Sequence, residues 1–299
     1  MRSSDQVRLN LSGYAKYREA LIESAGASIA LSLYTAGEDC PCIVFIPGTM
    51  THPLFYDDFL SLLAGSGYNV AGVHLLSHGK SPRQKKLFTF DDMLQNVRDT
   101  VTYCLDNISK TVILMGSSQG GILSLAAAGM DSRIKAVFPH NVLIPGLKSS
   151  ISVTSFPQFL KPFNGAVTAL MRLAACIAPA TQMPLTFYLE MDRITKSQAI
   201  QEQFYSDPLN LTSYPLSFLT SLFTADLSRV SDGSIKCPVV VIASTGDTLF
   251  SYSYCLEVFE KIAAPHKEML VFDEPYHLIF NECPERVIGP VAQKLNEYK

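Results

Sequence analysis

The chain has 299 residues, of which 47% are hydrophobic and 17% charged, and its formal net charge is −3. This length suits one large domain, or a core domain with an inserted lobe. A nucleic-acid partner requires a concentrated basic face, which this charge balance does not indicate, so we expect no nucleic-acid partner.

The cysteines and the N-terminal segment predict a cytoplasmic protein. The seven cysteines are odd in number and scattered, and Cys40 and Cys42 are too close together for a C-x-x-C metal or redox pair. Residues 1–20 are polar and lack the apolar centre of a signal peptide. We therefore expect free thiols in a reducing compartment and no metal site. No run of about 18 apolar residues occurs, so we expect no transmembrane helix.

Short β-branched runs alternate with longer amphipathic segments along most of the chain. We expect strands at 28–35, 42–46, 69–75, 111–115, 134–139, 238–244 and 268–272. We expect helices at 54–66, 90–107, 119–129, 252–263 and 285–298. Several of the strands are apolar on both faces, as parallel strands covered by helices must be. The alternation predicts an α/β fold with a doubly wound, mostly parallel sheet.

The region from about 141 to 236 interrupts this alternation. It contains apolar helical segments separated by prolines, and no strand is expected there. The strand pattern resumes at Cys237 and Pro238. We therefore predict an α/β core formed by residues 1–140 and 237–299, with 141–236 inserted as a helical lid.

Residues 116–120 read Gly-Ser-Ser-Gln-Gly and fit the pattern G-x-S-x-G, with Ser118 at its centre. An expected strand precedes this pattern and a helix rich in small residues follows it. Such a strand-to-helix turn holds its central serine in a strained backbone conformation, near a helix N-terminus that favours a developing anion. The pattern therefore predicts a nucleophilic serine; the alternative is a structural glycine turn.

A serine hydroxyl needs a histidine base and a carboxylate that orients the base. Asp247 follows the expected strand 238–244, and His277 follows the expected strand 268–272. The carboxyl ends of parallel strands meet at one edge of a sheet, where α/β proteins gather their ligands. Each residue alone also fits a structural role. Together the order Ser118, Asp247, His277 predicts a catalytic triad.

These residues together resemble the α/β-hydrolase superfamily of serine hydrolases, in the branch of the monoacylglycerol lipases and lysophospholipases. The resemblance rests on five segments: IVFIPGTMTH at 43–52, NVAGVHLLSHGKSP at 69–82, GSSQGG at 116–121, STGDTLF at 244–250 and EPYHLIF at 274–280. Three positions depart from the pattern of the branch. Pro47 stands in place of its usual histidine, His74 in place of an aspartate, and Ser77 in place of a glycine.

The resemblance implies a mechanism without a cofactor. Ser118 would attack the carbonyl, His277 would take its proton, and Asp247 would orient the imidazole. The backbone N–H groups of Thr49 and Gln119 would form the oxyanion hole.

The apolar lid indicates a lipophilic substrate. Its Leu170 and Leu173 would form a wall of an acyl-chain pocket or a surface that touches lipid, and His52 and His140 are further candidates for substrate contact. The alternatives are packed or solvent-facing roles. The sequence thus predicts hydrolysis of a carboxylic ester such as a monoacylglycerol or lysophospholipid, with transient membrane contact through the lid. A thioesterase, lactonase or acyltransferase would use the same triad, and a non-catalytic small-molecule receptor is a different class on the same fold.

Overall fold

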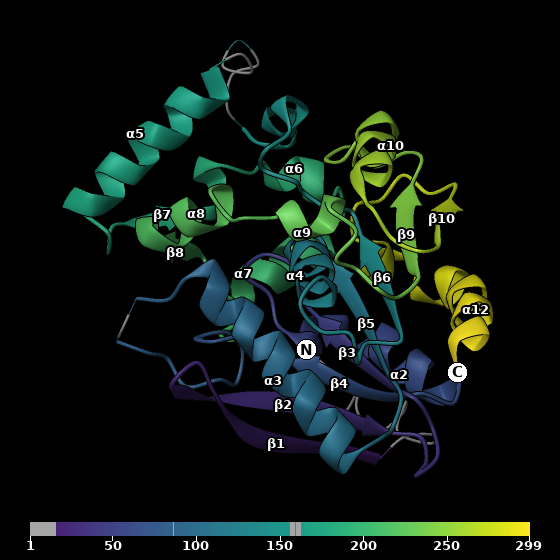
Figure 1. Ribbon diagram of the computed structural model, residues 1–299. Coiled ribbons are helices and arrows are strands. Elements are labelled where there is room, and N and C mark those ends of the chain that lie inside the picture. Colours follow the sequence, from purple (N-terminus) through teal and green to yellow (C-terminus); the bar gives the residue numbers. More distant parts are fainter. Residues whose placement is uncertain (1–15, 86, 156–158, 160–162) are drawn as a thin grey trace.

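A computed structural model describes residues 16–299, except 86, 156–158 and 160–162. Among these residues, eight strands form one sheet in the order β1-β2-β4-β3-β5-β6-β9-β10 (Figure 1). The strands are β1 Lys16–Ser24, β2 Ala27–Thr35, β3 Cys42–Ile46, β4 Asn69–Val73, β5 Val112–Ser117, β6 Ala136–His140, β9 Val239–Ser244 and β10 Lys267–Phe272. From β4 to β10 neighbouring strands are parallel, whereas β1 and β2 pair antiparallel. The predicted mostly parallel α/β sheet is confirmed.

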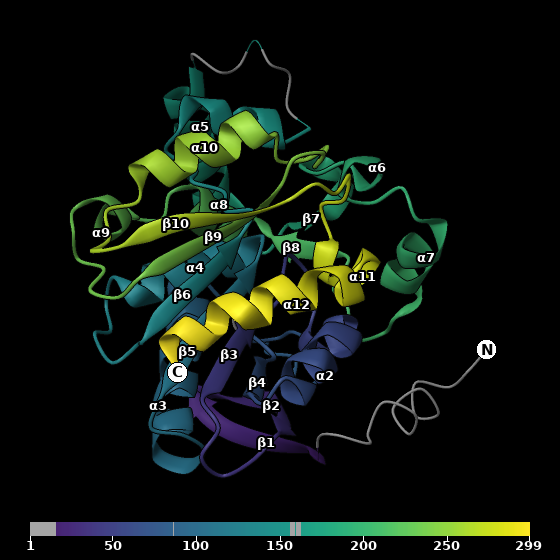
Figure 2. The ribbon, with the colours of Figure 1, turned by 90° about the vertical axis from the view of Figure 1, so that its right-hand side faces the viewer.

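Helices cover both faces of this sheet, with α2 and α12 in front of it in Figure 2 and α3 and α4 behind it. The main helices are α2 Asp57–Gly65, α3 Phe90–Asn107, α4 Gln119–Ala128, α10 Tyr252–Lys261 and α12 Pro284–Leu295. The start of α3 is specified locally, because the Thr89 hydroxyl accepts from Asp92 N while the Asp92 carboxylate accepts from Thr89 N. This reciprocal capping box satisfies two backbone donors at the helix end.

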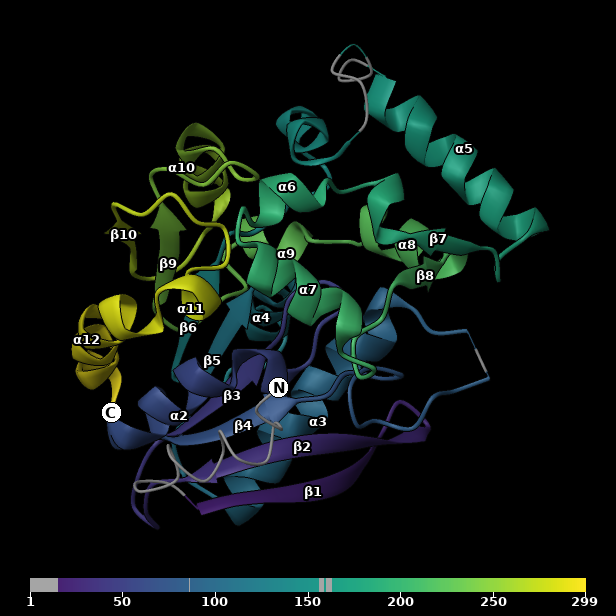
Figure 3. The same cartoon turned by 180° about the vertical axis from the view of Figure 1, so that it is seen from behind.

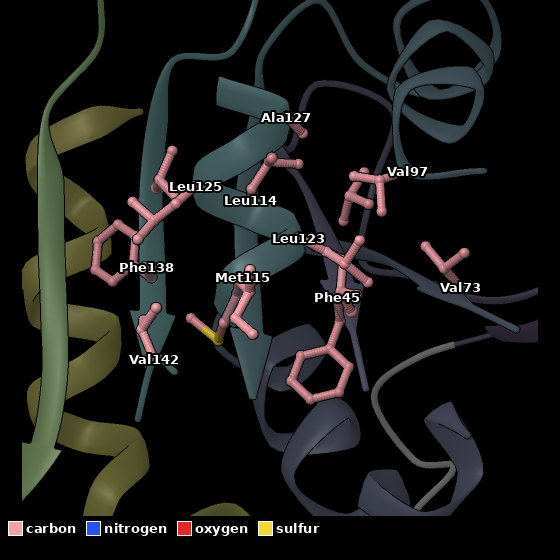
Figure 4. Packing of buried hydrophobic residues seen from close by; sticks show 14 of the residues in the cluster. Phe45, Val73, Val97, Leu114, Met115, Leu123, Leu125, Ala127, Phe138 and Val142 are labelled. Carbon is pink, nitrogen blue, oxygen red and sulfur yellow. The ribbon is translucent and has the colours of Figure 1, made fainter. Parts of the chain in front are cut away.

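The helix that follows the serine lies at the centre of the core. All ten residues of α4 are buried, as expected for a helix without a polar face. Figure 4 shows Leu123 and Leu125 of this helix beside Leu114 and Met115 of β5. Full burial of each such side chain contributes about 1.5–3 kcal/mol. The segment that carries Ser118 is therefore anchored from both sides.

The edge strand β1 was not predicted from the sequence. Most of its side chains are exposed or half-buried, so its hydrophobic alternation is weak. It pairs with β2 through a two-residue turn in which Ala25 has φ 53° and Gly26 has φ 75°. Positive φ at both positions matches the twist of a tight hairpin.

We call residues 141–236 the cap segment. Its elements are η2 Lys148–Val153, α5 Asn164–Ile177, β7 Gln182–Pro184, η4 Leu185–Phe187, α6 Met191–Ile194, α7 Gln198–Ser206, β8 Ser213–Pro215, α8 Leu216–Phe223 and α9 Ser228–Ser231. Figure 3 shows α5, α6, α7 and α8 together at one end of the sheet. The expectation that this segment has no strand is wrong, since β7 and β8 pair antiparallel. Three-residue strands that contain proline are too short to produce a recognisable alternation.

Within the described ranges, no helix combines the length and the apolar character needed to cross a membrane.

Candidate active site

Ser118 lies in a sharp turn between β5 and α4. Its backbone has φ 54° and ψ −112°, a positive-φ conformation outside the regions that a residue with a side chain ordinarily adopts. The turn is so tight that a Cβ on Gly116 would lie 2.0 Å from Gly120 O, and one on Gly120 would lie 2.1 Å from Ile46 O. The two glycines of the pattern are therefore required by the packing of the backbone around Ser118.

Asp247 and His277 form a buried pair beside this turn. His277 Nδ1 donates to Asp247 Oδ2 over 2.9 Å, and Asp247 Oδ1 accepts from the backbone N–H groups of Leu249 and Phe250 at 2.7 and 2.9 Å. Burial opposes ionisation of Asp247, but the adjacent His277 and these hydrogen bonds outweigh it and lower the pKa of the carboxyl. Because Nδ1 carries the donated proton, the neutral ring keeps Nε2 as its basic nitrogen.

Asn141, directly after β6, completes the support of the carboxylate. Its Nδ2 donates to Asp247 Oδ2 over 2.7 Å and lies 3.4 Å from His277 O. Its backbone has φ 51°, a conformation that asparagine tolerates better than most residues. Sequence reasoning missed this residue; an asparagine at the end of a buried strand is the available signal.

The loop after β3 passes beside Ser118. A Cβ on Gly48 would lie 3.6 Å from Ser118 Cβ. Gly48 N donates to Tyr56 and Met50 N donates to Tyr214, whereas Thr49 N and Gln119 N make no hydrogen bond within the part of the chain that is described. These two N–H groups flank the serine and remain available to an oxyanion.

A buried hydrogen-bond chain connects the cap segment to this loop. Tyr214 OH accepts from Met50 N over 2.8 Å and lies 2.8 Å from His78 Nε2. Burial lowers the pKa of His78 to about 4, and its Nδ1 donates to Leu76 O, so Nε2 accepts from the tyrosine. Tyr214 therefore fixes the residue next to Thr49. The sequence carried no signal for this contact.

Two narrow apolar cavities meet at Ser118, with volumes of about 40 and 30 Å³. Both are lined by Thr49, Ser118, Leu189 and Leu249. The first, the His277 lobe, is further lined by residues that include Thr51, Tyr56, Ile194, Thr195, Phe204 and His277. The second, the Gln119 lobe, is further lined by residues that include Gln119, Ile122, Val153, Thr154, Tyr188 and Leu222. Ser118 thus lies between two apolar spaces.

Two predicted substrate contacts lie outside both lobes. The ring of His52 is buried against His74, and its Nε2 contacts Asp207 Oδ2 at 3.0 Å, beside a different cavity. His140 is fully buried behind the site, with its ring 4.8 Å from Phe280 and 6.1 Å from that of His277. Neither histidine reaches the space beside Ser118, because each is held by packing inside the protein.

Leu170 and Leu173 do not form a pocket wall either. They are 67% and 59% exposed on the outer face of α5, which packs against α8 by its other side. The expected acyl-chain wall is wrong for these two residues, because the helix turns them toward solvent. Among the residues described, no three His, Cys, Asp or Glu side chains are grouped as a metal site requires.

A strained serine at a strand-to-helix elbow, beside an Asp–His pair on a mostly parallel sheet, defines the serine-type α/β hydrolases. A family model described as "Serine aminopeptidase, S33" matches residues 37–284, and the chain belongs to this family. The resemblance to the α/β-hydrolase superfamily seen in the sequence is confirmed, and the chain is a hydrolase by its family.

Three relatives illustrate the similarity. Phospholipase YtpA of Bacillus subtilis (strain 168) is 23% identical over 249 residues, covering 82% of this chain and 90% of that protein. A monoacylglycerol lipase of Paleococcus ferrophilus has a TM-score of 0.70 and 20% identity, with 95% of this chain and 100% of that chain covered. A soluble variant of monoglyceride lipase from Saccharomyces cerevisiae, in complex with a substrate analogue, has a TM-score of 0.73 and 16% identity, with 96% of each chain covered.

Proposed function

We propose that the enzyme cleaves a carboxylic ester of a lipophilic acyl substrate, such as a monoacylglycerol or a lysophospholipid, through an acyl-enzyme on Ser118. The observation that carries this proposal is the strained Ser118 between apolar cavities, one of which also contains His277. The names of the similar proteins, a phospholipase and two monoglyceride lipases, support the class of substrate.

In the proposed mechanism, Ser118 Oγ attacks the ester carbonyl and His277 Nε2 takes its proton. Asp247 holds the ring in the required tautomer and stabilises the imidazolium. The tetrahedral oxyanion is bound by Thr49 N and Gln119 N, each donor contributing about 3–4 kcal/mol to lowering the barrier. His277 then protonates the leaving alcohol, and water resolves the acyl-enzyme by the same steps. A thioester, lactone or acyl-transfer reaction would share these steps.

The test is hydrolysis of p-nitrophenyl esters from acetyl to palmitoyl by the wild type and by Ser118→Ala. We expect the rate to peak at medium or long chains and to vanish in the variant, and a fluorophosphonate to label only the wild type. A preference for acetyl would contradict the lipophilic pocket. No labelling and equal rates for both proteins would contradict catalysis and favour a receptor on this fold.

We also propose that the cap segment touches lipid surfaces transiently. The support is the outer face of α5, where Leu170, Leu173 and Ile177 are 67%, 59% and 77% exposed. Flotation with lipid vesicles should carry the wild type upward and leave the double variant Leu170→Ser, Leu173→Ser behind. Equal flotation of both would contradict the contact.

A cytoplasmic location is part of the same proposal, supported by the seven free cysteines. Fractionation of the source cells should recover the protein with cytoplasmic markers, and recovery with secreted proteins would contradict it.

A further inference from the structure

We propose that the substrate is apolar on both sides of the ester group, with its acyl chain in the Gln119 lobe and its alcohol in the His277 lobe. The inference rests on the proposed serine mechanism and names the substrate class more narrowly. Within the proposed class of lipophilic esters it favours an apolar leaving alcohol over the glycerol of a monoacylglycerol or the phosphorylated glycerol of a lysophospholipid, and it therefore replaces those two examples.

The chemistry assigns the lobes. The leaving oxygen must lie beside His277 Nε2, because that nitrogen protonates it. His277 lines one cavity and Gln119 the other, while Ser118 and Thr49 line both. A carbonyl carbon held at Ser118 therefore directs its alcohol into the lobe that contains His277. The acyl chain takes the remaining direction, past Gln119 and over the start of α4.

Three of the hydroxyl groups that line the His277 lobe already make hydrogen bonds within the protein. Thr51 Oγ1 donates to Gly48 O over 2.9 Å, and Tyr56 OH accepts from Gly48 N over 3.2 Å. Thr195 Oγ1 accepts from Ser197 N over 3.0 Å. The hydroxyls of a glycerol moiety would thus enter a mainly apolar space in which the hydroxyls of Thr51, Tyr56 and Thr195 already have partners. Each hydroxyl left unpaired there costs roughly tenfold in affinity or more.

The Gln119 lobe is also mainly apolar, and of the polar groups in its lining the Tyr188 hydroxyl has no hydrogen-bond partner within the described residues. The side-chain amide of Gln119 contacts Met93 Sδ and Tyr214 OH, and Thr154 Oγ1 donates to Ile151 O over 2.8 Å. Ile122, Val153 and Leu222 supply the apolar surface. Thr49 lies where the lobes meet, beside the ester group itself, so its hydroxyl does not make either end polar.

The first experiment compares two esters of one acid, butyl butanoate and glycerol 1-butanoate, by titration of the butanoic acid released. We expect kcat/KM for the butyl ester to be at least about tenfold higher, from the two unpaired glycerol hydroxyls. Equal values, or a preference for the glycerol ester, would overturn the inference while leaving the serine mechanism intact. If the wild type hydrolyses neither ester and resists fluorophosphonate, the proposed function itself fails.

The second experiment tests the assignment of the lobes with two isomers, hexyl acetate and methyl heptanoate, which carry the long chain on opposite sides of the ester. Ile194→Phe narrows the His277 lobe and should lower the hexyl acetate to methyl heptanoate rate ratio at least about fivefold, as expected for a few crowded methylenes. Leu222→Phe narrows the Gln119 lobe and should raise the same ratio. The ratio is independent of the amount of folded enzyme. Opposite shifts, or no shift in either variant, would overturn the assignment.

Discussion

The loops at the carboxyl ends of the strands and the cap segment supply the same site in different ways. The loops carry Ser118, Asp247 and His277, whose positions follow from short local motifs and the strand order. The cap supplies Leu189 and Leu222 to the lobes and Tyr214 to the loop after β3, across long sequence separations. The residues of the predicted triad are thus encoded locally, whereas the walls of the lobes depend on tertiary packing.

The largest effect should come from the loops. Asp247→Asn should lower kcat about 10³–10⁴-fold, because the amide favours the wrong tautomer of His277 and no longer stabilises the imidazolium. The new amide would also face the Asn141 amide, which now donates to Asp247 Oδ2. Steady-state kinetics on a p-nitrophenyl ester measures the loss.

The matched control is Asp273→Asn, one strand end away, where the carboxylate accepts from the Thr245 hydroxyl over 2.7 Å. An asparagine oxygen can accept the same bond, so kcat should stay within about twofold of the wild type. Equal losses in the two variants would show that Asp247 has no special role beside His277.

The same division explains which features were predictable from the sequence. The core strands were predicted because each is apolar over its own length, and α3 was predicted because it carries its own cap. The turn at Ser118 was predicted because its two required glycines lie within five residues of one another. The edge strand β1 lacks a strong pattern, and β7 and β8 are too short to have one.

Contacts between distant residues left no trace in the sequence. The bond between Met50 N and Tyr214 OH joins residues 164 positions apart, and Asn141 reaches Asp247 across 106. Neither a motif nor a hydrophobic period encodes such a pairing. For the same reason the apolar α5 was assigned to the pocket, although its leucines face solvent.

A pair of cap tyrosines sharpens the comparison. Tyr214→Phe removes the acceptor of Met50 N and the donor to His78, so it should cost about 2–4 kcal/mol of unfolding free energy and lower kcat several-fold. Tyr188 is also buried, but its hydroxyl has no hydrogen-bond partner within the described residues. Tyr188→Phe should therefore be neutral or stabilising. Urea unfolding and kcat of both variants check this. A larger loss of kcat in Tyr188→Phe than in Tyr214→Phe would assign the Tyr188 hydroxyl to the substrate.

His140 tests the core side of the site through its pH dependence. Burial, with a smaller contribution from His277, lowers the pKa of His140 to about 3, so the folded protein keeps the ring neutral. The His140 imidazole of the unfolded chain has a pKa of about 6.5, so below that pH only the unfolded chain gains this proton. The unfolding free energy therefore falls by about 1.4 kcal/mol for each unit by which the pH is lowered. His140→Phe should therefore gain about 2 kcal/mol relative to the wild type between pH 7.5 and 5.

The measurement is the urea-unfolding free energy of both proteins at the two pH values. His266→Gln, which removes an exposed imidazole, is the control for the loss of a histidine at the surface. Because His140 lies outside both lobes, KM for p-nitrophenyl butanoate should be unchanged in His140→Phe. A raised KM would return His140 to the substrate site.

The smallest effect is expected on the outer face of the cap. Leu170→Ser should leave kcat and KM for a fully dissolved ester unchanged. Its unfolding free energy should stay within about 0.5 kcal/mol of the wild type, because the exposed side chain buries little area on folding. Leu189→Ser, at a buried position between the lobes, is the contrasting variant and should raise KM for the same ester. If Leu170→Ser weakens turnover of the dissolved ester as much as Leu189→Ser does, the outer face of α5 belongs to the pocket. The cap would then have no separate lipid-facing surface and substrate-facing interior.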